Sequence, residues 1–416
     1  MATYDLPYGK KYLQVEIPSK ADVEIIAPIT VTAADDPLLI VKESLDQSDL
    51  EKYKMVNRVA IAVNDKTRPV PHEFLLPPLL TKLKEIGVKT SNVQFLIATG
   101  THLPMPANEY PLILPKQILE QSSVQSHDCD DIGNLVNLGQ TSHGTPVYVN
   151  RLFFKADLKI VVGNLEPHHF MGFSGGVKSA SIGLAGRRTI NINHAMLVDP
   201  MAKIAEYKRN PMRQDVEEIG QMIGVDFALN AILNQDKQIV EILAGNPRKV
   251  MEGGIPIARQ ICQVNIAQLF DVVIASVGGY PKDINLYQSQ KALSHACLIA
   301  KDGGTVILVA ECIEGSGSKG FEEFMKDVHT FKEVLDKFNK QEFQIGPHKA
   351  FQIAQQGARV NIILVSSMPD TKVLGFLLTP ASSIHEALQI AITKFGSGLP
   401  TIAIMPRATN TIPNIG

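Results

Sequence analysis

The sequence predicts an α/β fold with two α/β domains, mostly parallel sheets and an active-site cleft between the domains. Its length of 416 residues allows two or three domains of roughly 150 residues each. Short β-branched runs alternate with stretches of helical period, as in strands joined by crossover helices. The alternation starts again after about residue 280. We therefore expect an N-terminal cofactor-binding domain over residues 1–275, with residues 400–416 as a candidate completion, and a C-terminal domain over residues 276–399.

The first 55 or so residues are interrupted by prolines, and we predict no helix or strand there. The predicted elements of the first domain follow this segment. Short apolar runs predict buried strands, and helical-period stretches that follow turns predict helices. The predicted strands are Asn57–Val63, Val93–Ala98, Leu158–Val162 and Val272–Val277, and the predicted helices are Pro71–Ile86, Asp215–Ile223 and Pro247–Val264.

The second domain repeats the alternation. The predicted strands are Thr305–Val309, Val360–Val365 and Thr401–Met405, and the predicted helices are Phe321–Phe338 and His385–Phe395. Ligands of parallel sheets bind beyond the carboxyl ends of the strands or in the cleft between units. Polar residues that directly follow strands are therefore the first candidates for a site.

The composition excludes several classes of protein. Lys plus Arg number 40 against 42 Asp plus Glu, so the chain lacks the basic field that a nucleic-acid partner requires. No apolar run reaches the roughly 18 residues of a membrane span, and the first residues lack the apolar core of a signal peptide. The four cysteines form no Cys-x-x-Cys pair, so we expect reduced thiols and a cytoplasmic protein.

Two polar clusters follow the first two strands. Residues 64–71 contain Asp65 and Arg68, and the planar guanidinium of Arg68 suits a carboxylate or phosphate. Residues 100–105 contain His102, an imidazole suited to proton transfer near neutral pH. The alternatives are a capped turn with a surface ion pair and a structural or exposed histidine.

The densest cluster follows the strand Leu158–Val162. Residues 166–179 combine His168 and His169 with glycines, Ser174 and Lys178, which indicates backbone N–H groups and an ammonium that meet a phosphate. It is not a Walker A loop, because Val177 stands where that pattern has glycine. The alternative is a tight glycine turn that opens a helix.

Two further clusters complete the set. His194 could ligate a metal, but no His-Glu-x-x-His motif and no cysteine set accompanies it, so a zinc hydrolase is a forced interpretation. Residues 285–291 begin the second domain with Tyr287, Gln288 and Lys291, and the alternative there is a plain helix start.

Together these clusters resemble the nickel-pincer lactate racemase family. The motifs occur in the family's order and spacing and run through most of the chain: Asp-x-Thr-Arg-Pro at 65–69, Gly-Thr-His at 100–102, Glu-Pro-His at 166–168, Gly-Phe-Ser-Gly-Gly-x-Lys at 172–178 and Asn-His at 193–194. The resemblance implies an isomerase, a racemase or epimerase of a 2-hydroxy carboxylic acid.

The resemblance also implies a cofactor, the nickel-pincer nucleotide, which is pyridinium-3-thioamide-5-thiocarboxylic acid mononucleotide with bound nickel. Lys178 matches the lysine that carries it covalently, and His194 matches the histidine that completes the planar nickel site. The remaining residues assigned to cofactor binding are Asp65, Thr67, Gly172, Ser174, Gly175 and Gly176. Recombinant protein made without the maturation enzymes is expected to lack the cofactor.

The mechanism implied by the resemblance is reversible, proton-coupled hydride transfer from Cα of the substrate to the cofactor. His102 and His168 match the two bases, one for each enantiomer, and imidazoles in general, with an ordinary pKa of about 6.5, suit both roles. Arg68, Gln288 and Lys291 match residues that bind the substrate carboxylate, and Tyr287 is assigned to the substrate with them. For Asp65, support of Arg68 or of a histidine remains open.

Departures from the family leave the substrate open. Leu103 stands where relatives often have arginine, and the chain has no tryptophan, with Phe351 in roughly that region. The expected partners are a small 2-hydroxy acid and cofactor-maturation enzymes, and a homodimer is a candidate assembly. Two alternative functions remain, a noncatalytic mononucleotide-binding protein and a metal-dependent hydrolase or lyase of hydroxy acids. A noncatalytic mononucleotide-binding protein has no need for two bases, and a metal-dependent hydrolase or lyase leaves Lys178 without a role.

Overall fold

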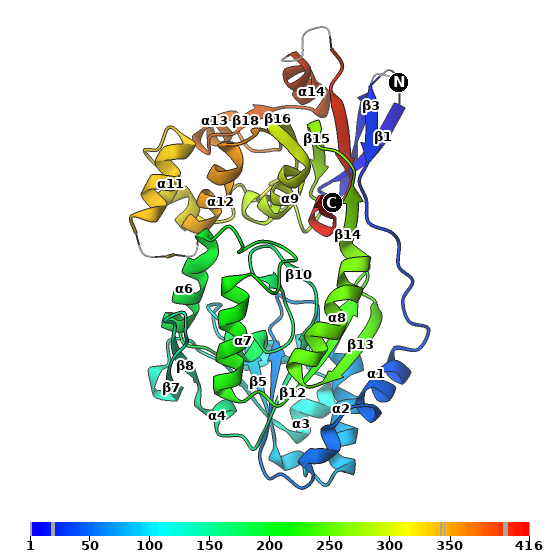
Figure 1. Cartoon of the computed structure of the whole chain (residues 1–416), viewed down its shortest axis with the longest axis vertical. Helices are drawn as coiled ribbons and strands as arrows, with labels where there is room; N and C mark the ends of the chain where they lie inside the picture. Colours follow the sequence, from blue (N-terminus) through cyan, green and yellow to red (C-terminus); the bar gives the residue numbers. More distant parts are fainter. Residues whose placement is uncertain (1, 18–20, 342, 345, 394–397, 416) are drawn as a thin grey trace. The chain divides into compact units, whose positions relative to one another are not determined.

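The chain divides into two units whose boundaries differ from the predicted ones. The computed structural model describes residues 2–17, 21–341, 343–344, 346–393 and 398–415. The N-terminal unit is Thr30–Ile261, and the C-terminal unit combines Met1–Ile29 with Cys262–Gly416. Figure 1 shows both units, coloured along the sequence. Residues 1–29, which the prediction assigned to the first domain, and residues 400–416, which it gave as a candidate completion of that domain, group with the C-terminal unit.

The N-terminal unit is built on a six-stranded sheet of order β13-β12-β9-β4-β5-β6. Its neighbours are parallel except for the antiparallel pair β12–β13. The central strands are apolar on both faces, as expected where helices cover both sides. The strands of the sheet are β4 (Val59–Asn64), β5 (Val93–Ala98), β6 (Ser123–Ser126), β9 (Leu158–Asn164), β12 (Phe227–Leu233) and β13 (Ile239–Gly245), and two short hairpins add β7 (Leu135–Gln140), β8 (Pro146–Asn150), β10 (Pro167–His168) and β11 (Gly172–Phe173).

Helices cover the two faces of this sheet. One apolar cluster joins β4 and β5 to α1 and α2, and the other joins β4 and β9 to α4, α5, α7 and α8. The helix α7 shows clear end signals, because Asn210 caps its start, Pro211 is its first residue, and Gly224 ends it in the left-handed conformation. The helices of the unit are α1 (Pro37–Asp46), α2 (His72–Glu85), α3 (Lys116–Gln121), α4 (Arg151–Phe154), α5 (Lys178–Ser181), α6 (Arg187–Ala195), α7 (Pro211–Ile223) and α8 (Pro247–Cys262).

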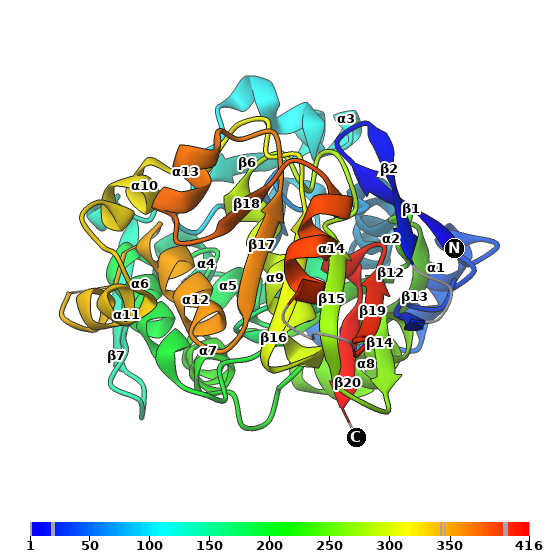
Figure 2. The same ribbon diagram turned by 90° about the horizontal axis from the view of Figure 1, so that it is seen from above.

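The C-terminal unit has a parallel six-stranded sheet of order β18-β17-β16-β15-β19-β3. Figure 2 shows its strands side by side with α14 over one face. The strands are β3 (Asp22–Ile25), β15 (Phe270–Ser276), β16 (Ala300–Val309), β17 (Asn361–Val365), β18 (Thr379–Ala381) and β19 (Thr401–Met405), with the pairs β1 (Ala2–Tyr8) and β2 (Lys11–Ile17), and β14 (Gln263–Ile266) and β20 (Ile412–Ile415). The helices are α9 (Leu286–Ile299), α10 (Lys319–Met325), α11 (Phe331–Asn339), α12 (Pro347–Gly357), α13 (Asp370–Gly375) and α14 (Ile384–Ile392).

Packing explains why the N-terminal residues belong to this unit. The hairpin β1–β2 buries Leu6, Val15 and Ile17 in one apolar cluster with Val272 of β15 and Leu388 of α14. In addition, β3 forms the edge of the sheet beside β19. The predicted α/β class with mostly parallel sheets is confirmed.

Most predicted elements exist, with one clear exception. The predicted helix Phe321–Phe338 is two helices, α10 and α11, because Asp327 adopts a left-handed conformation (φ 59°) and Thr330 caps a new helix start. The predicted helix His385–Phe395 corresponds to α14, and its predicted end lies outside the described residues.

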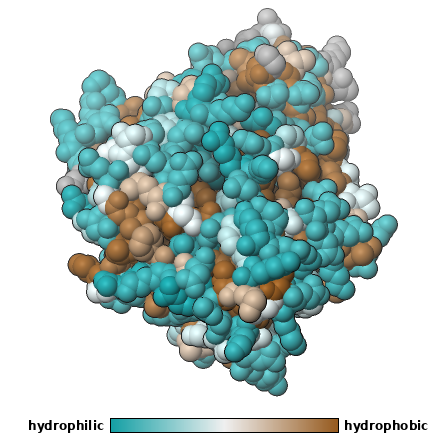
Figure 3. All heavy atoms as spheres, turned by 60° about the horizontal axis from the view of Figure 1, so that its bottom comes forward, coloured by the Kyte–Doolittle hydropathy of each residue, from teal (hydrophilic) through white to brown (hydrophobic). Residues whose placement is uncertain are grey.

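The molecular surface in Figure 3 is mostly hydrophilic, with separate hydrophobic patches. Within the described residues, no helix is both long and apolar enough to cross a membrane.

Candidate active site

Three loops of the N-terminal unit meet at one edge of its sheet. Strands β9, β4 and β5 are parallel neighbours, so their carboxyl ends share an edge. Asp65 follows β4, His102 follows β5, and His168 follows β9. The amide of Asn164 donates to the Pro69 carbonyl at 3.0 Å, which joins the loops after β9 and β4.

The carboxylate of Asp65 holds His102 and its own turn. One oxygen accepts from the backbone N–H of Thr67 at 3.0 Å and from its hydroxyl at 2.6 Å, and the other lies 2.6 Å from Nδ1 of His102. Burial alone raises the pKa of Asp65, but the hydrogen bonds from His102 and Thr67 outweigh it and lower the pKa below its ordinary value. Asp65 is therefore ionised, and it directs the Nδ1 proton of His102 toward itself, which leaves Nε2 as a proton acceptor.

Of the two contacts considered for Asp65, the structure shows the one with a histidine. Arg68 instead donates from Nη1 to the carbonyl and hydroxyl of Thr67, at 3.4 and 3.2 Å. Thr67 therefore bridges Asp65 and Arg68.

His168 belongs to an aromatic group that reaches His194. The His168 ring stacks on His169 and meets the Phe170 ring edge-on at 4.6 Å between centroids. The Phe170 ring also meets the His194 ring edge-on, with 5.5 Å between the centroids. Nδ1 of His168 accepts from the backbone N–H of Met171 at 3.2 Å, so the proton of the neutral ring lies on Nε2. In this arrangement His102 presents a proton acceptor and His168 presents a donor.

Lys178 is the first residue of α5, directly after the glycine turn 172–176. Its ammonium donates to the Ser174 hydroxyl at 3.4 Å. Gly172, Gly175 and Gly176 all have positive φ, and a Cβ on Gly172 would lie 1.8 Å from the Glu206 carbonyl, so the turn requires glycine there.

The amides of this turn are largely used within the protein. Ser174 N–H donates to the Glu166 carbonyl at 2.7 Å, and Gly176 N–H donates to the Asn230 side chain at 2.7 Å. A phosphate bound at the turn would therefore take other donors than these two groups.

His194 lies near the end of α6, within reach of the charge on Lys178. Burial, followed by the positive charge of Lys178, lowers the pKa of His194 to about 4. The imidazole is therefore neutral at neutral pH, the state in which it can ligate a metal. The neutral, half-buried imidazole of His194, near the amine of Lys178, is a donor that a metal or a cofactor could use.

The predicted substrate residues of the C-terminal unit lie at the start of α9. Asn285 caps this helix, and Lys291 donates to the Gln288 side chain at 3.3 Å. Burial raises the pKa of Tyr287 above its ordinary value. The lysine Lys349, which the sequence analysis missed, lies with its ammonium 5.4 Å from the Tyr287 ring centroid.

The Lys349 ammonium also donates to the Gln290 side chain at 2.7 Å. Burial, followed by the charge of Lys291, lowers its pKa well below the ordinary value. The helical period of the sequence could have identified Lys349. In α12 it lies on the same buried face as Ala350, Ile353 and Ala354.

Two residues at which the sequence departs from the family differ in their surroundings. Leu103, next to His102, is 89% exposed. Phe351 is buried and stacks on Phe338 with 4.6 Å between ring centroids, so it serves the core of the C-terminal unit.

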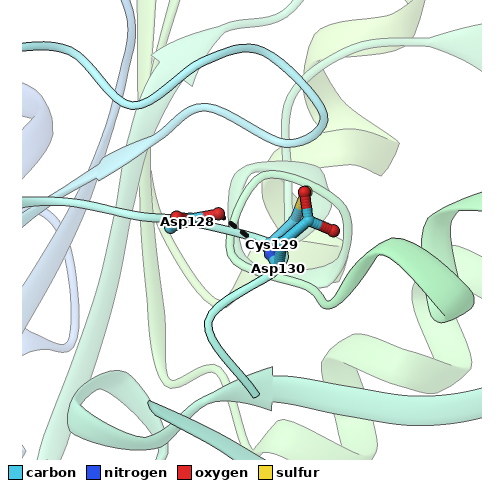
Figure 4. A group of neighbouring side chains, drawn as sticks. All are labelled: Asp128, Cys129 and Asp130. Carbon is cyan, nitrogen blue, oxygen red and sulfur yellow. Dashed lines mark hydrogen bonds between the residues drawn. The ribbon is translucent and has the colours of Figure 1, made fainter. Parts of the chain in front are cut away.

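A group of candidate metal ligands lies apart from these residues in sequence, at Asp128, Cys129 and Asp130 (Figure 4). Both carboxylate oxygens of Asp130 accept hydrogen bonds from Arg187, at 2.6 and 2.7 Å. Burial raises the pKa of the Cys129 thiol, which disfavours the thiolate that would bind a metal. The turn that these three residues form explains why their side chains lie close together, and a metal ion is not needed to explain it.

Comparisons with known proteins agree on one family. The family model of the lactate racemase N-terminal domain matches residues 8–205, and that of the lactate racemase C-terminal domain matches residues 266–412. The chain is 31% identical to a lactate racemase of Thermoanaerobacterium thermosaccharolyticum over 408 residues, covering 94% of each chain. It is 29% identical to a lactate racemase of Lactiplantibacillus plantarum, covering 97% of this chain and 98% of the relative.

Solved structures give the same result. The lactate racemase apoprotein of Thermoanaerobacterium thermosaccharolyticum matches with a TM-score of 0.92 at 30% identity, covering 99% of this chain and all of that chain. A protein of Thermotoga maritima shares the fold, with a TM-score of 0.66 at 18% identity over 93% of this chain.

Proposed function

Because the chain belongs to the lactate racemase family, we propose that this isomerase interconverts the two enantiomers of a 2-hydroxy carboxylic acid with a nickel-pincer nucleotide bound at Lys178. Two observations carry the proposal. His102, held by Asp65, and His168 follow neighbouring strands at one edge of the sheet. Lys178 and His194 lie in α5 and α6 of the same unit, and the Phe170 ring contacts the rings of both His168 and His194.

The donor set fits the proposed cofactor. Lys178 would carry it through an amide-type bond, and the neutral imidazole of His194 would hold its metal. When bound, the cofactor supplies reversible hydride acceptance, which lets Cα become planar and lose its configuration.

The protein residues supply proton transfer and orientation. His102 removes the hydroxyl proton of one enantiomer at Nε2, because the carboxylate of Asp65 occupies its Nδ1–H and stabilises the imidazolium that forms. His168 removes the hydroxyl proton of the other enantiomer. In each direction of the reaction, one histidine acts as the base and the other acts as the acid. For His168 to act as base at Nε2, its proton must move from Nε2 to Nδ1, which breaks the hydrogen bond that Nδ1 accepts from the Met171 N–H.

Cationic side chains orient the substrate in this proposal. Arg68 offers a planar fork and Lys291 a point charge, and both suit the carboxylate that every 2-hydroxy acid carries. Holding this group fixes Cα and its hydroxyl relative to the bases, an orientation effect that lowers the barrier. The identity of the acid is tested by a screen of chiral 2-hydroxy acids followed by polarimetry.

The experiment that tests the proposal is mass spectrometry combined with mutation. Protein produced alongside the cofactor-building enzymes should carry an adduct on the peptide that contains Lys178, with near-stoichiometric nickel. The His102→Ala and His168→Ala variants should keep the adduct and lose interconversion. A noncatalytic nucleotide binder would show no turnover in the parent protein, and a zinc hydrolase would show no adduct. Full turnover in both histidine variants would refute the two-base assignment.

A further inference from the structure

The helix α7 carries a charged side chain that the proposed mechanism does not use. Arg213 is 0% exposed and is the largest fully buried side chain of the described residues. A buried guanidinium is stable only where its charge and its N–H groups are satisfied. The partners that satisfy it therefore indicate what it does.

Two of these partners are carbonyls of the glycine turn before Lys178. Nη1 donates to the carbonyl of Phe173 at 3.0 Å, and Nη2 donates to the carbonyl of Gly175 at 3.1 Å. These carbonyls lie on either side of Ser174, whose hydroxyl accepts from the ammonium of Lys178. The Gly175 carbonyl also accepts from the backbone N–H of Lys178 at 3.4 Å. One guanidinium thus contacts the residue that accepts from the Lys178 backbone, Gly175, and both chain neighbours of Ser174, which accepts from the Lys178 side chain.

The guanidinium is itself held in place on the opposite side. Nε and Nη2 donate to one oxygen of Glu217 at 2.9 and 2.6 Å, and the Tyr207 hydroxyl donates to the same oxygen at 3.1 Å. The Tyr207 ring lies 5.4 Å from the guanidinium carbon. Glu217 supplies the opposite charge, and the Tyr207 ring and the Glu217 carboxylate together hold the guanidinium in one orientation.

The glycine turn is closely packed by neighbouring side chains. The Gly176 N–H donates to Asn230, and a Cβ on Gly176 would lie 2.7 Å from Met251 and 3.0 Å from Nη2 of Arg213. A Cβ on Gly175 would lie 3.0 Å from the Asn230 side chain. Arg213 and Asn230 therefore hold the turn from two sides.

We propose that Arg213 is a positioning residue for Lys178: by binding the carbonyls of Phe173 and Gly175, it fixes the turn that presents the lysine amine for cofactor attachment. This inference rests on the proposed function for the role of Lys178, whereas the ordering of the turn is independent of it.

The first test measures backbone hydrogen exchange in the cofactor-free protein. The Arg213→Met variant removes both carbonyl contacts, and exchange in peptides that cover residues 172–178 should become about tenfold faster or more. Peptides that cover β5 should exchange as in the parent. The matched control is Arg248→Met, because Arg248 also pairs with a glutamate one helical turn later, Glu252, but is exposed. Unchanged exchange in 172–178, or the same acceleration in the control, would overturn the proposal.

The second test measures the fraction of Lys178 that carries the adduct after production with the cofactor-building enzymes. Arg213→Met should lower this fraction by about tenfold while the protein remains folded, and Arg213→Lys, which keeps one charged donor, should restore part of it. Parental loading of Arg213→Met would overturn the positioning role.

The proposal stays testable if the Arg213→Met variant does not fold or if the parent protein gains no adduct. If Arg213→Met does not fold, Arg213→Lys and Tyr207→Phe replace it, and each should accelerate exchange in 172–178 by a smaller factor; parental exchange in both would overturn the proposal. If the parent itself gains no adduct, the proposed function fails, and the exchange experiment still decides whether Arg213 orders the turn.

Discussion

Nδ1 of His102 lies 2.6 Å from a carboxylate oxygen of Asp65, an acid that is 4% exposed. The same acid accepts two hydrogen bonds from Thr67. Its negative charge therefore fixes both the rotamer and the tautomer of the histidine. This pair makes Asp65 part of the proton-transfer apparatus in our account.

The substitution Asp65→Asn should lower kcat for racemisation by about 100-fold or more, because the amide no longer fixes the Nδ1–H tautomer or stabilises the imidazolium. Cofactor loading on Lys178 is measured in parallel, so that kcat is expressed per loaded enzyme. The exposed acid Asp302, which pairs with Arg359, provides the control variant Asp302→Asn, which should match the parent. Parental kcat in Asp65→Asn would show that the pair is structural only.

Stability should fall as the pH is lowered from about 6.5 to about 4. Burial lowers the pKa of His72 from 6.5 to about 4, so the unfolded chain binds a proton in this window that the folded protein excludes. The stability that neutral His72 provides is therefore complete above pH 6.5 and is lost as the pH falls toward 4, at about 1.4 kcal/mol per pH unit for one histidine.

The variant His72→Gln tests this cause. Urea unfolding at pH 7 and pH 4.5 should show a decrease in unfolding free energy that is smaller than in the parent by roughly 2 kcal/mol. The exposed His385 provides the control, because His385→Gln should keep the parental decrease. An equal decrease in His72→Gln and the parent would assign the pH dependence to other groups.

The glycine turn before Lys178 should be more sensitive to substitution than another glycine of similar conformation. Gly176 (φ +54°) and Gly224 (φ +73°) both have positive φ, but a Cβ at Gly224 would meet nothing within 4 Å, whereas one at Gly176 would meet Met251 and Arg213. Gly224→Ala should lower the free energy of unfolding by about 1 kcal/mol, from backbone strain alone. Gly176→Ala should lower it by roughly 2–4 kcal/mol, because steric overlap adds to the strain. Equal losses by urea denaturation would contradict the packing argument.

Removal of the Lys291 charge should affect substrate binding more than chemistry. We expect Lys291→Met to raise KM for the 2-hydroxy acid by about tenfold or more, since a charge-assisted hydrogen bond to the carboxylate is lost. The matched control is Lys301→Met, a lysine of the same unit that pairs with Asp271. A KM that stays at the parental value would remove Lys291 from the substrate site.

Local sequence patterns were sufficient to predict the central strands and the loops that follow them. The bounds of β5 and β19 agree with the prediction, because short apolar runs between turn residues leave little choice of register. His102 and Lys178 could be singled out because they directly follow strands or glycine turns, where side chains reach a ligand.

Long-range contacts explain what the sequence could not predict. The pairing of β3 with β19 joins residues at opposite ends of the chain and depends on tertiary packing. Arg213 was missed because an Arg–Glu pair four residues apart on a helix is the usual pattern of an exposed face. The break between α10 and α11 was visible in principle, since Thr330-x-x-Glu333 is the sequence pattern of a helix start. The Thr330 hydroxyl accepts from the Glu333 N–H, and the Glu333 carboxylate accepts from the N–H of His329.

The central claim is that hydrogen leaves Cα of a 2-hydroxy acid and returns to it without exchange with water. The most direct measurement uses a single enantiomer deuterated at Cα, incubated in ordinary water with protein that carries the cofactor, and follows the product of opposite configuration by mass spectrometry. The account predicts that this product retains its deuterium. Replacement of the deuterium by solvent hydrogen during inversion would contradict the account.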